Sequence, residues 1–321
     1  MMSLHATDSP QDLATRLRHE DAEVRRVAVM ELPYSDEDDI LPLLLHAIVD
    51  ADGAVRAESA KAMEGFEEPE AVSALLALLA DHNEEARRAA ADSLAELKDP
   101  SNGALLLRSL ASADPFVQAS VFRALRPLRV AESLAPALAA LEHIAPQVRR
   151  EATGVLGYLK HAGSLGPLAR VATNDPDVEV RRVAVGALGF ASDVEVLPAL
   201  TNALSDTSWQ VREEAAGTLG KLKLVGATDH LITAMDDRYW QVRVRAARSL
   251  GRLKTSAALP ALATALGHEI SNLRKEAAIA LGEIGDPKAI PALEGALGDA
   301  DPDVRKLAQL ALKQILSTTK S

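Results

Sequence analysis

Several residue types are scarce or missing in this chain of 321 residues, and each absence removes a class of function. There is no cysteine, which excludes disulfides, thiolate metal sites and a cysteine nucleophile. No stretch approaches the roughly 18 consecutive apolar residues of a membrane-spanning helix, so we expect no membrane partner. The first residues lack the basic and apolar regions of a secretory signal peptide. We therefore expect a cytoplasmic protein.

The hydrophobic core must be built from small aliphatic side chains. Aromatic residues make up only 3% of a chain that is 48% hydrophobic, which leaves alanine, leucine and valine. The net charge is −11, from 35 Lys and Arg against 46 Asp and Glu. Because Lys and Arg supply the affinity for a phosphate backbone, this balance argues against nucleic acid as the main partner.

One phrase, approximately Asp-x-x-Val-Arg-x-x-Ala-Ala-x-x-Leu-Gly, recurs from one end of the chain to the other. Its apolar anchor returns every 31 residues, with a single interval of 32 that we assign to the loop at residues 175–177. We expect one domain over residues 1–321. The ten anchors are Val24, Val55, Ala86, Val117, Val148, Val180, Val211, Val242, Leu273 and Val304.

Each repeat has the pattern of two helices, and no segment alternates with a period of two residues. Second helices are expected to follow a capping Asp, as at Asp114, Asp175 and Asp301, each of which precedes a proline. A unit of this size cannot bury its own hydrophobic face, so neighbouring repeats must stack. The sequence therefore predicts an all-α fold, an α-solenoid (superhelix) of about ten 31-residue helical hairpins.

Glycine and proline refine this prediction. Five repeats carry glycine nine residues after the anchor, as at Gly220 and Gly251. Because glycine within a helix costs about 1 kcal/mol relative to alanine, we expect close helix–helix contact there. Pro33 and Pro127 are expected to end their second helices early.

The phrase Val-Arg-x-x-Ala-Ala-x-x-Leu-Gly at a period near 31 resembles the HEAT-like repeats of the phycobilisome-lyase (PBS lyase) type. The resemblance covers the whole chain. It implies that the second helix of each hairpin lines the concave face of the solenoid. The family's repeats occur in lyase subunits, a hydroxylase, adaptors and assembly factors, so the resemblance implies a fold more specifically than a function.

Arginine follows the anchor in nine of the ten repeats, and Gln118 is the exception. Such a column either binds anions or forms a ladder in which each arginine bonds carboxylates and carbonyls of adjacent repeats. We favour the ladder, because a binding site need not recur in every repeat. His19, His143 and His268 share one loop position in distant repeats, so they cannot share a metal. We predict no catalytic residues, no metal and no cofactor.

The second helices are expected to expose the positions +2, +3, +6 and +10 from the anchor, at about 100° per residue. Charges on these positions sum to +4, which leaves −15 on the rest of the chain. Three arginines form a ridge on one helix, and the +10 position changes from aromatic to basic over four repeats. The predicted partner-binding residues are Arg245, Arg248, Arg252, Lys221, Phe190, Tyr158, Arg182 and Arg150.

The chain's two tryptophans, Trp209 and Trp240, both lie two residues before an anchor, in adjacent repeats. Each either wedges against the neighbouring loop or anchors a partner at the edge of the solenoid.

These features favour a non-catalytic scaffold or adaptor whose concave face binds a partner protein with an acidic surface. Assistance with that partner's maturation, cofactor loading, assembly or turnover is one role the resemblance implies. The alternative is a bilin lyase subunit or related cofactor-handling factor, in which Arg248 and Arg252 would pair with propionates. An iron-dependent hydroxylase of the deoxyhypusine hydroxylase type is less favoured, because His19-Glu20 and His268-Glu269 are His-Glu pairs in the wrong register. The sequence indicates no oligomeric state.

Overall fold

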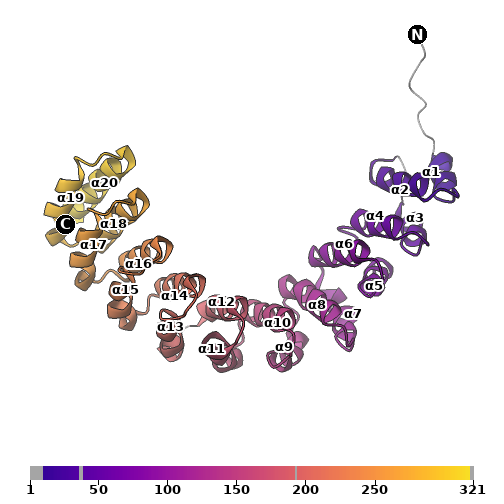
Figure 1. The fold of residues 1–321 in the computed structure, drawn as a ribbon, viewed down its shortest axis with the longest axis horizontal. Coiled ribbons are helices and arrows are strands. Elements are labelled where there is room, and N and C mark those ends of the chain that lie inside the picture. The colour runs from indigo at the N-terminus through magenta and orange to yellow at the C-terminus, as the bar shows by residue number, and fades with distance from the viewer. Residues whose placement is uncertain (1–9, 36–38, 192–193, 319–321) are drawn as a thin grey trace, which may run out of the picture. The chain divides into compact units, whose positions relative to one another are not determined.

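The computed structural model describes residues 10–35, 39–191 and 194–318, and within these ranges it contains helices and no strands. The all-α prediction is therefore confirmed. The chain divides into two compact units, Met1–Leu159 and Lys160–Ser321. Each described unit is a stack of five helical hairpins, with first helices in one layer and second helices in the other (Figure 1).

In the first unit, consecutive second helices pack side by side, and each first helix packs on the second helix of its own hairpin. The first helices are α1 (Pro10–Arg16), α3 (Leu41–Ala47), α5 (Pro69–Leu78), α7 (Gly103–Ser109) and α9 (Leu134–Ala140). The second helices are α2 (Ala22–Glu31), α4 (Gly53–Ala62), α6 (Glu84–Ala95), α8 (Pro115–Leu128) and α10 (Pro146–Leu159).

The second unit repeats this plan. Its first helices are α11 (Leu165–Asn174), α13 (Leu197–Ala203), α15 (Thr228–Ala234), α17 (Leu259–Ala265) and α19 (Ile290–Ala296). Its second helices are α12 (Val178–Ala187), α14 (Trp209–Leu222), α16 (Trp240–Leu253), α18 (Ser271–Ile284) and α20 (Pro302–Thr318).

Short 3-10 helices lie at the turns between hairpins. They are η1 (Leu32–Tyr34), η2 (Pro100–Asn102), η3 (Ala131–Ser133), η4 (Ala162–Ser164), η5 (Leu188–Phe190), η6 (Val194–Val196), η7 (Val225–Ala227), η8 (Ser256–Ala258) and η9 (Pro287–Ala289).

The repeat anchors form the core of each stack. Nine of the ten are at most 4% exposed, and Val24 in the first hairpin is half-buried. Alanine, leucine and valine supply most of the other buried side chains, as the composition predicts. Small side chains let the helices approach closely, which suits a core only one hairpin thick.

Two glycines show how closely adjacent second helices approach. A Cβ atom added at Gly220 would lie 2.8 Å from the Cα of Ser249, and one added at Gly251 would lie 2.8 Å from the Cα of Ala280. Real Cβ atoms do not approach backbone so closely, so only glycine fits at these two contacts. The predicted packing reason is confirmed there.

One of the two proline predictions is wrong. Pro33 does end a helix, because α2 stops at Glu31 and the chain continues as η1. Pro127 instead lies inside the last turn of α8, which runs on to Leu128 before Arg129 leaves the helix at a φ of 53°. Pro127 has no N–H to donate to the carbonyl of Arg123, so the last turn lacks one backbone hydrogen bond, yet the helix keeps its length.

The extra residue of the repeat pattern is also placed differently from the prediction. It lengthens α11, which has 10 residues where the other first helices of the second unit have 7. The cap of α12 is Asp177, whose Oδ1 accepts from the backbone N–H groups of Glu179 at 2.9 Å and Val180 at 3.1 Å. Asp175, expected as the cap, instead accepts from the Asp177 N–H at 2.9 Å.

Candidate protein-binding surface

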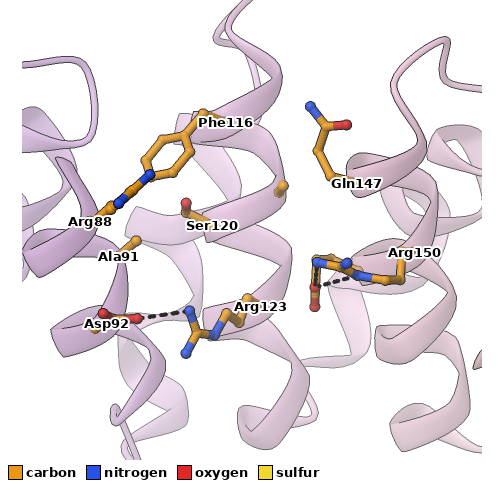
Figure 2. Close-up of a pocket in the computed structure, with 10 residues that line it drawn as sticks. Arg88, Ala91, Asp92, Phe116, Ser120, Arg123, Gln147 and Arg150 are labelled. Carbon is orange, nitrogen blue, oxygen red and sulfur yellow. Dashed lines mark hydrogen bonds and ion pairs between the residues drawn. The ribbon is translucent and has the colours of Figure 1, made fainter. Parts of the chain in front are cut away.

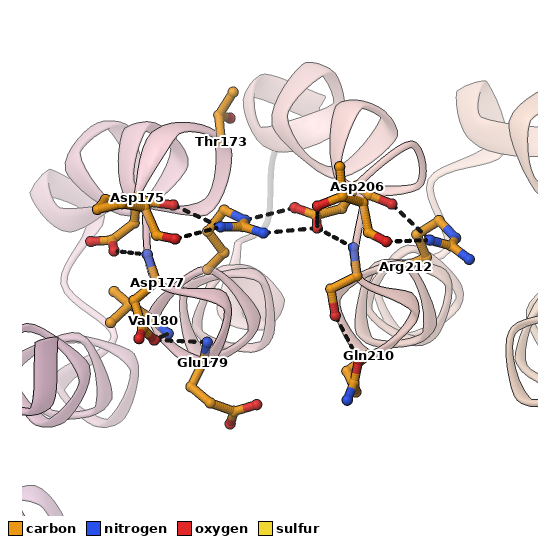
Figure 3. A network of polar contacts seen from close by, with 12 residues as sticks. Thr173, Asp175, Asp177, Glu179, Val180, Asp206, Gln210 and Arg212 are labelled. Carbon is orange, nitrogen blue, oxygen red and sulfur yellow. Dashed lines mark hydrogen bonds and ion pairs between the residues drawn. The ribbon is translucent and has the colours of Figure 1, made fainter.

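The arginine column forms the predicted ladder. Arg181 donates from Nε to Asp206 Oδ2 at 2.7 Å and from Nη2 to Asp206 Oδ1 at 2.9 Å, while its Nη1 donates to the carbonyl of Asp175 at 2.8 Å (Figure 3). Arg212 repeats this rung with Asp237, 25 residues further along the chain, at 2.6 and 2.9 Å. The same two-pronged pairing joins Arg25 to Asp50, Arg56 to Asp81 and Arg274 to Asp299.

At two rungs of the ladder a histidine stands where the carboxylate would be. Gln118 faces the position of His143, and Arg243 faces the position of His268. The Nδ1 atom of His268 accepts from the Ile270 N–H at 3.0 Å, as Asp237 does from Tyr239 at 2.8 Å. The neutral ring then carries its proton on Nε2 and offers Arg243 no acceptor. Accordingly the buried Nε of Arg243 has no hydrogen-bond partner in the described chain.

Not every position expected to face solvent does so. Position +3 is buried at Ala89, Ser120, Glu151 and Glu276, each at most 8% exposed. The prediction is wrong there because adjacent second helices pack along this row, which covers side chains that a single helical wheel leaves open.

The predicted arginine ridge is largely occupied by ion pairs between hairpins. Arg248 donates from Nε and Nη2 to both carboxylate oxygens of the buried Glu276 on α18, at 2.8 and 2.7 Å. Arg245 reaches back to Glu213 on α14, with Nη2 3.0 Å from Oε1. Of the ridge, Arg252 alone makes no side-chain hydrogen bond or ion pair within the described residues, and it is exposed.

Three predicted residues nevertheless come together around one depression on the second-helix face of the second unit, the basic hollow. Lys221, Arg245 and Arg252 line a volume of about 230 Å³, and Glu214 is the one carboxylate among the described residues that line it. The space exists because α12 and α14 have glycine at position +6, where the other second helices of this unit carry Arg248, Ile279 and Leu310. The lining residues are Gly186, Glu214, Gly217, Thr218, Lys221, Arg245 and Arg252.

The cations of the basic hollow differ in how they are bound. Lys221 is exposed and, like Arg252, has no carboxylate partner in the described structure. A Cβ atom added at Gly217 would come within 3.1 Å of the Arg245 Cδ, so the glycine lets that side chain lie across the floor. Two unpaired cations beside a hollow can receive a carboxylate without first breaking an ion pair.

The remaining predicted residues lie outside the basic hollow. Arg182 pairs with Glu179 on its own helix at 2.8 Å, and Arg150 pairs with Glu151 at 2.9 Å. Phe190 is half-buried at the end of η5.

Tyr158 belongs to the first unit and is 45% exposed. The guanidinium groups of Arg126 and Arg129 lie 5.7 and 5.9 Å from the centre of its ring. Tyr158 is therefore accessible to a partner, but two arginines of its own unit already contact its ring.

The two tryptophans differ in their surroundings. Trp209 stacks on Tyr239 of the next hairpin, with 5.6 Å between ring centres and 21° between planes. The guanidinium of Arg238 lies 4.9 Å from the centre of that tyrosine ring. Trp209 thus wedges against the neighbouring loop, whereas Trp240 is 39% exposed and accessible to a partner.

A second hollow, which the sequence reasoning did not find, lies on the second helices of the first unit (Figure 2). It encloses about 310 Å³ between Arg88, Phe116, Arg123 and Arg150, over a floor that includes Ala119. The sequence does contain a feature that could have indicated this hollow: α8 has a small alanine at position +2, whereas α6 and α10 on either side have arginines there.

The cations of this second hollow are compensated. Arg123 donates to Asp92 at 2.9 Å, as a dashed line in Figure 2 shows. Arg150 donates from Nη2 to Glu151 Oε1, also at 2.9 Å. Arg88 bonds Glu84 on its own helix. The hollow in the first unit is therefore less suited to an acidic ligand than the basic hollow of the second unit.

Within the described residues no three His, Asp or Glu side chains are grouped as metal ligands. No helix in the described part of the chain is long and apolar enough to cross a membrane.

Comparison with known families agrees with the helical-hairpin architecture. A model of HEAT repeats matches residues 10–95, 49–126, 134–201, 167–243 and 228–313. The chain belongs to the HEAT-repeat family. The match is to HEAT repeats in general, and the narrower phycobilisome-lyase type stays a prediction. The comparison with curated proteins finds no similar sequence.

Solved HEAT-like structures resemble the chain in fold. An engineered protein is 22% identical, with 95% of this chain and 98% of that chain covered at a TM-score of 0.57. YibA of Escherichia coli is 20% identical, with 93% and 98% covered at a TM-score of 0.54. Kap95p, from a study of its binding to RanGDP, is 15% identical, with 95% of this chain but 51% of Kap95p covered at a TM-score of 0.65. At these identities the likeness concerns the HEAT solenoid itself.

Proposed function

We propose that this HEAT-repeat protein is a non-catalytic scaffold or adaptor that binds an acidic segment of a partner protein in the basic hollow. The observation that carries the proposal is the pair Lys221 and Arg252, two exposed cations beside a hollow with no carboxylate partner in the described chain. The protein as a whole has a net charge of −11, so two unpaired cations at one place form a local positive patch that attracts an acidic segment.

The fold supports binding of a protein. Stacked hairpins present a long surface of repeated second helices, on which partners can be held over several repeats. Kap95p, which shares only the fold, occurs in complexes with RanGDP and with Nup1. We further propose that the bound protein is a client for maturation, cofactor loading, assembly or turnover, and that this takes place in the cytoplasm.

The alternative of a bilin lyase subunit has weaker support from the geometry. It would assign Arg248 and Arg252 to the propionates of a chromophore. Arg248 is bound to the buried Glu276 at 2.7 and 2.8 Å, so that arginine would have to leave a carboxylate first. Arg252 is then the better placed of the two. The hydroxylase alternative gains no support from the His-Glu pairs, since His268 binds the Ile270 N–H within its loop.

The test is a charge reversal confined to the unpaired cations. A double variant, Lys221→Glu with Arg252→Glu, is compared with the wild type for binding a fluorescein-labelled glutamate-rich peptide at fixed salt. Because a rim charge changes association and its salt dependence, we expect the peptide affinity to fall at least about tenfold and its salt dependence to flatten. Captured client proteins, compared by mass spectrometry, are expected to be lost in parallel.

A matched control makes the same change of net charge in the same two hairpins. Lys223→Glu with Lys254→Glu alters exposed residues outside the basic hollow and leaves Lys221 and Arg252 in place. Its affinity is expected to stay near the wild-type value. If both double variants lose the peptide equally, the attraction is a general effect of charge and the assignment to the basic hollow is wrong.

A further inference from the structure

The arginine ladder of the second unit ends on a rung without a carboxylate. Arg305, in the last described hairpin, donates from Nη1 to the carbonyls of Asp299 and Ala300 at 2.6 and 3.1 Å. Arg212 binds the two equivalent carbonyls in the same way, and its Nε and Nη2 atoms then hold Asp237. Arg305 is exposed, and no carboxylate of the described chain bonds its Nε or Nη2. Its guanidinium is therefore held in the orientation of a rung, with two donors left for a carboxylate.

A position that belongs to the core in other hairpins is uncovered close to this rung. Leu297, at the end of α19 and seven residues before the anchor, is 42% exposed. In six other hairpins the residue at this position is at most 8% exposed, namely Leu17, Ile48, Leu79, Leu141, Met235 and Leu266. On α20, Leu310 and Leu316 are 51% and 49% exposed, so the last described hairpin carries an apolar surface of three leucines.

Leu310 lies on the side of α20 that points away from the rest of the stack. Positions +6 and +9 of α14 are Gly217 and Gly220, and a Cβ atom added at either would come within 3.1 Å of α16 in the next hairpin. These two positions thus face the following hairpin. In α20 they are Leu310 and Lys313, both of which are exposed. Lys313 stands where α14, α16 and α18 carry glycine, so the surface does not suit another hairpin packed as closely as those of the stack.

Basic side chains surround this apolar surface. Arg305, Lys306 and Lys313 are all exposed on α20. The neighbouring carboxylates of Asp301 and Asp303 already pair with a lysine of α18, at 3.0 and 3.3 Å. A partner must therefore combine apolar and acidic groups. The end surface, as we call it, consists of Leu297, Arg305, Lys306, Leu310, Lys313 and Leu316.

A second copy of the chain does not supply these groups. Two copies joined by their end surfaces would bring Arg305, Lys306 and Lys313 of one against the same cations of the other. A copy stacked head to tail would present its first hairpin, where His19 stands at the position of the rung carboxylate. The Nδ1 atom of that histidine accepts from the Asp21 N–H at 3.0 Å, so its neutral ring offers Arg305 no acceptor. The occupant is therefore a different protein.

We propose that the end surface binds an amphipathic helix of a partner protein, with an aspartate three residues before the helix begins. Five complete rungs show this ligand, because the aspartate of each precedes a second helix by three residues. The aspartate would accept from Nε and Nη2 of Arg305, a two-pronged pairing that is among the strongest polar contacts. Such a rung needs no glycine at +9, since Arg56 forms one in a repeat with Glu64 there. Leucines of the helix would cover Leu297 and Leu310, as in other complexes of a helix with an apolar surface.

The probe is a fluorescein-labelled peptide with the sequence of residues 206–222. Its aspartate fills the rung of Arg181 in the chain itself, and the peptide has one more acidic than basic side chain. We expect the full chain to bind it with a Kd of about 0.1 mM, measured by fluorescence anisotropy. Arg305→Gln should weaken binding at least about tenfold, the effect of a lost charge-assisted pairing. This variant is expected to fold, because Gln118 occupies a ladder position and still donates to the carbonyl of Ser112 at 2.8 Å.

A double-mutant cycle tests whether the arginine and the aspartate meet. The peptide with Asp206→Asn should bind the wild type at least about tenfold more weakly, and Arg305→Gln should weaken that peptide no further. Lys254→Gln removes the same charge from an exposed site elsewhere in the second unit and should leave the affinity unchanged. Losses that multiply in the cycle, an equal loss in Lys254→Gln or the absence of saturable binding would overturn the proposal.

The end surface is separable from the basic hollow by a second variant. In Lys221→Gln with Arg252→Gln the peptide should keep its affinity within about twofold, because neither residue belongs to the end surface. If this variant loses the peptide while Arg305→Gln retains it, the peptide binds in the basic hollow and the proposal for the end surface is wrong.

Discussion

The guanidinium of Arg56 holds both carboxylate oxygens of Asp81, with Nε to Oδ2 and Nη2 to Oδ1 each 2.7 Å. The two side chains are 7% and 9% exposed. Arg56 also donates to the carbonyls of Asp50 and Ala51, while Asp81 accepts from the Asn83 N–H. A single pair therefore joins the start of one second helix to the loop that opens the next, and nearest-neighbour contacts of this kind stabilise a solenoid.

Loss of one rung carboxylate should destabilise the protein measurably. We expect Asp81→Asn to lower the free energy of unfolding by about 2–3 kcal/mol, because it leaves a nearly buried guanidinium facing an amide N–H₂. Urea unfolding followed by circular dichroism measures the change. The exposed Asp229→Asn serves as control and should stay within about 0.5 kcal/mol of the wild type. An Asp81 variant as stable as that control would show that the ladder is not a source of stability.

Repair of the rung at Arg243 should have the opposite effect. His268→Asp provides a carboxylate 25 residues after the arginine, the spacing of Arg212 and Asp237. The buried Nε of Arg243 then gains an acceptor, so we expect stability to rise by about 1–2 kcal/mol. The aspartate can still accept from the Ile270 N–H. His268→Asn, which keeps that turn without adding charge, is the control; a gain of the same size there would contradict the explanation.

Substitution of the close-contact glycines should reverse the usual helix-propensity effect. Gly220→Ala places a Cβ 2.8 Å from the Cα of Ser249, so we expect a loss of about 1–3 kcal/mol despite alanine's better propensity. Gly295→Ala in α19 meets no atom within 4 Å and should gain about 0.5 kcal/mol. Thermal unfolding of the two variants measures the contrast. Equal changes in both would refute the close-contact argument.

The ladder also predicts sensitivity to acid. Hydrogen bonds from Arg56 and Arg274 hold the pKa of Asp81 and of Asp299 below the ordinary 3.8, and a hydrogen bond from Lys275 lowers the pKa of Asp301 to about 2. Because the unfolded chain binds these protons more readily, the stabilisation is complete above the unfolded pKa. It should decline as the pH falls from about 4 towards 2.

Urea midpoints measured between pH 7 and pH 2.5 test this acid dependence. They should be steady at the upper end and fall at the lower end. In Asp299→Asn one of the shifted groups is gone, so the midpoint should start lower and fall less steeply. A variant whose curve runs parallel to that of the wild type would show that Asp299 contributes nothing to the pH dependence.

Much of the fold follows from the sequence because an α-solenoid is specified by local repetition. A period of 31 residues places nine of the ten anchors, such as Val211, at the same buried position of their hairpins. The boundary at Pro127 was not predictable in this way, since a proline costs the helix one backbone hydrogen bond and the sequence does not show whether packing against neighbouring hairpins outweighs that cost.

The candidate surface was predicted only in part. Lys221 and Arg252 are available because both are exposed and neither forms an ion pair with a described carboxylate. Arg248 occupies a similar register, yet it reaches the carboxylate of Glu276 on the adjacent helix. A helical wheel describes one helix at a time and contains no information on such pairs. Hollows depend on neighbouring helices as well, as Ala119 between Arg88 and Arg150 shows.

The stack of Trp209 on Tyr239 gives the protein an internal optical probe of one hairpin boundary. The chain has only two tryptophans, so the emission has two sources. Iodide should quench Trp240, which is 39% exposed, more strongly than Trp209, whose ring the tyrosine shields. Any event that parts α14 from α16 would expose the shielded indole and shift its emission to longer wavelength. Fluorescence can therefore follow the opening of this boundary without an added label.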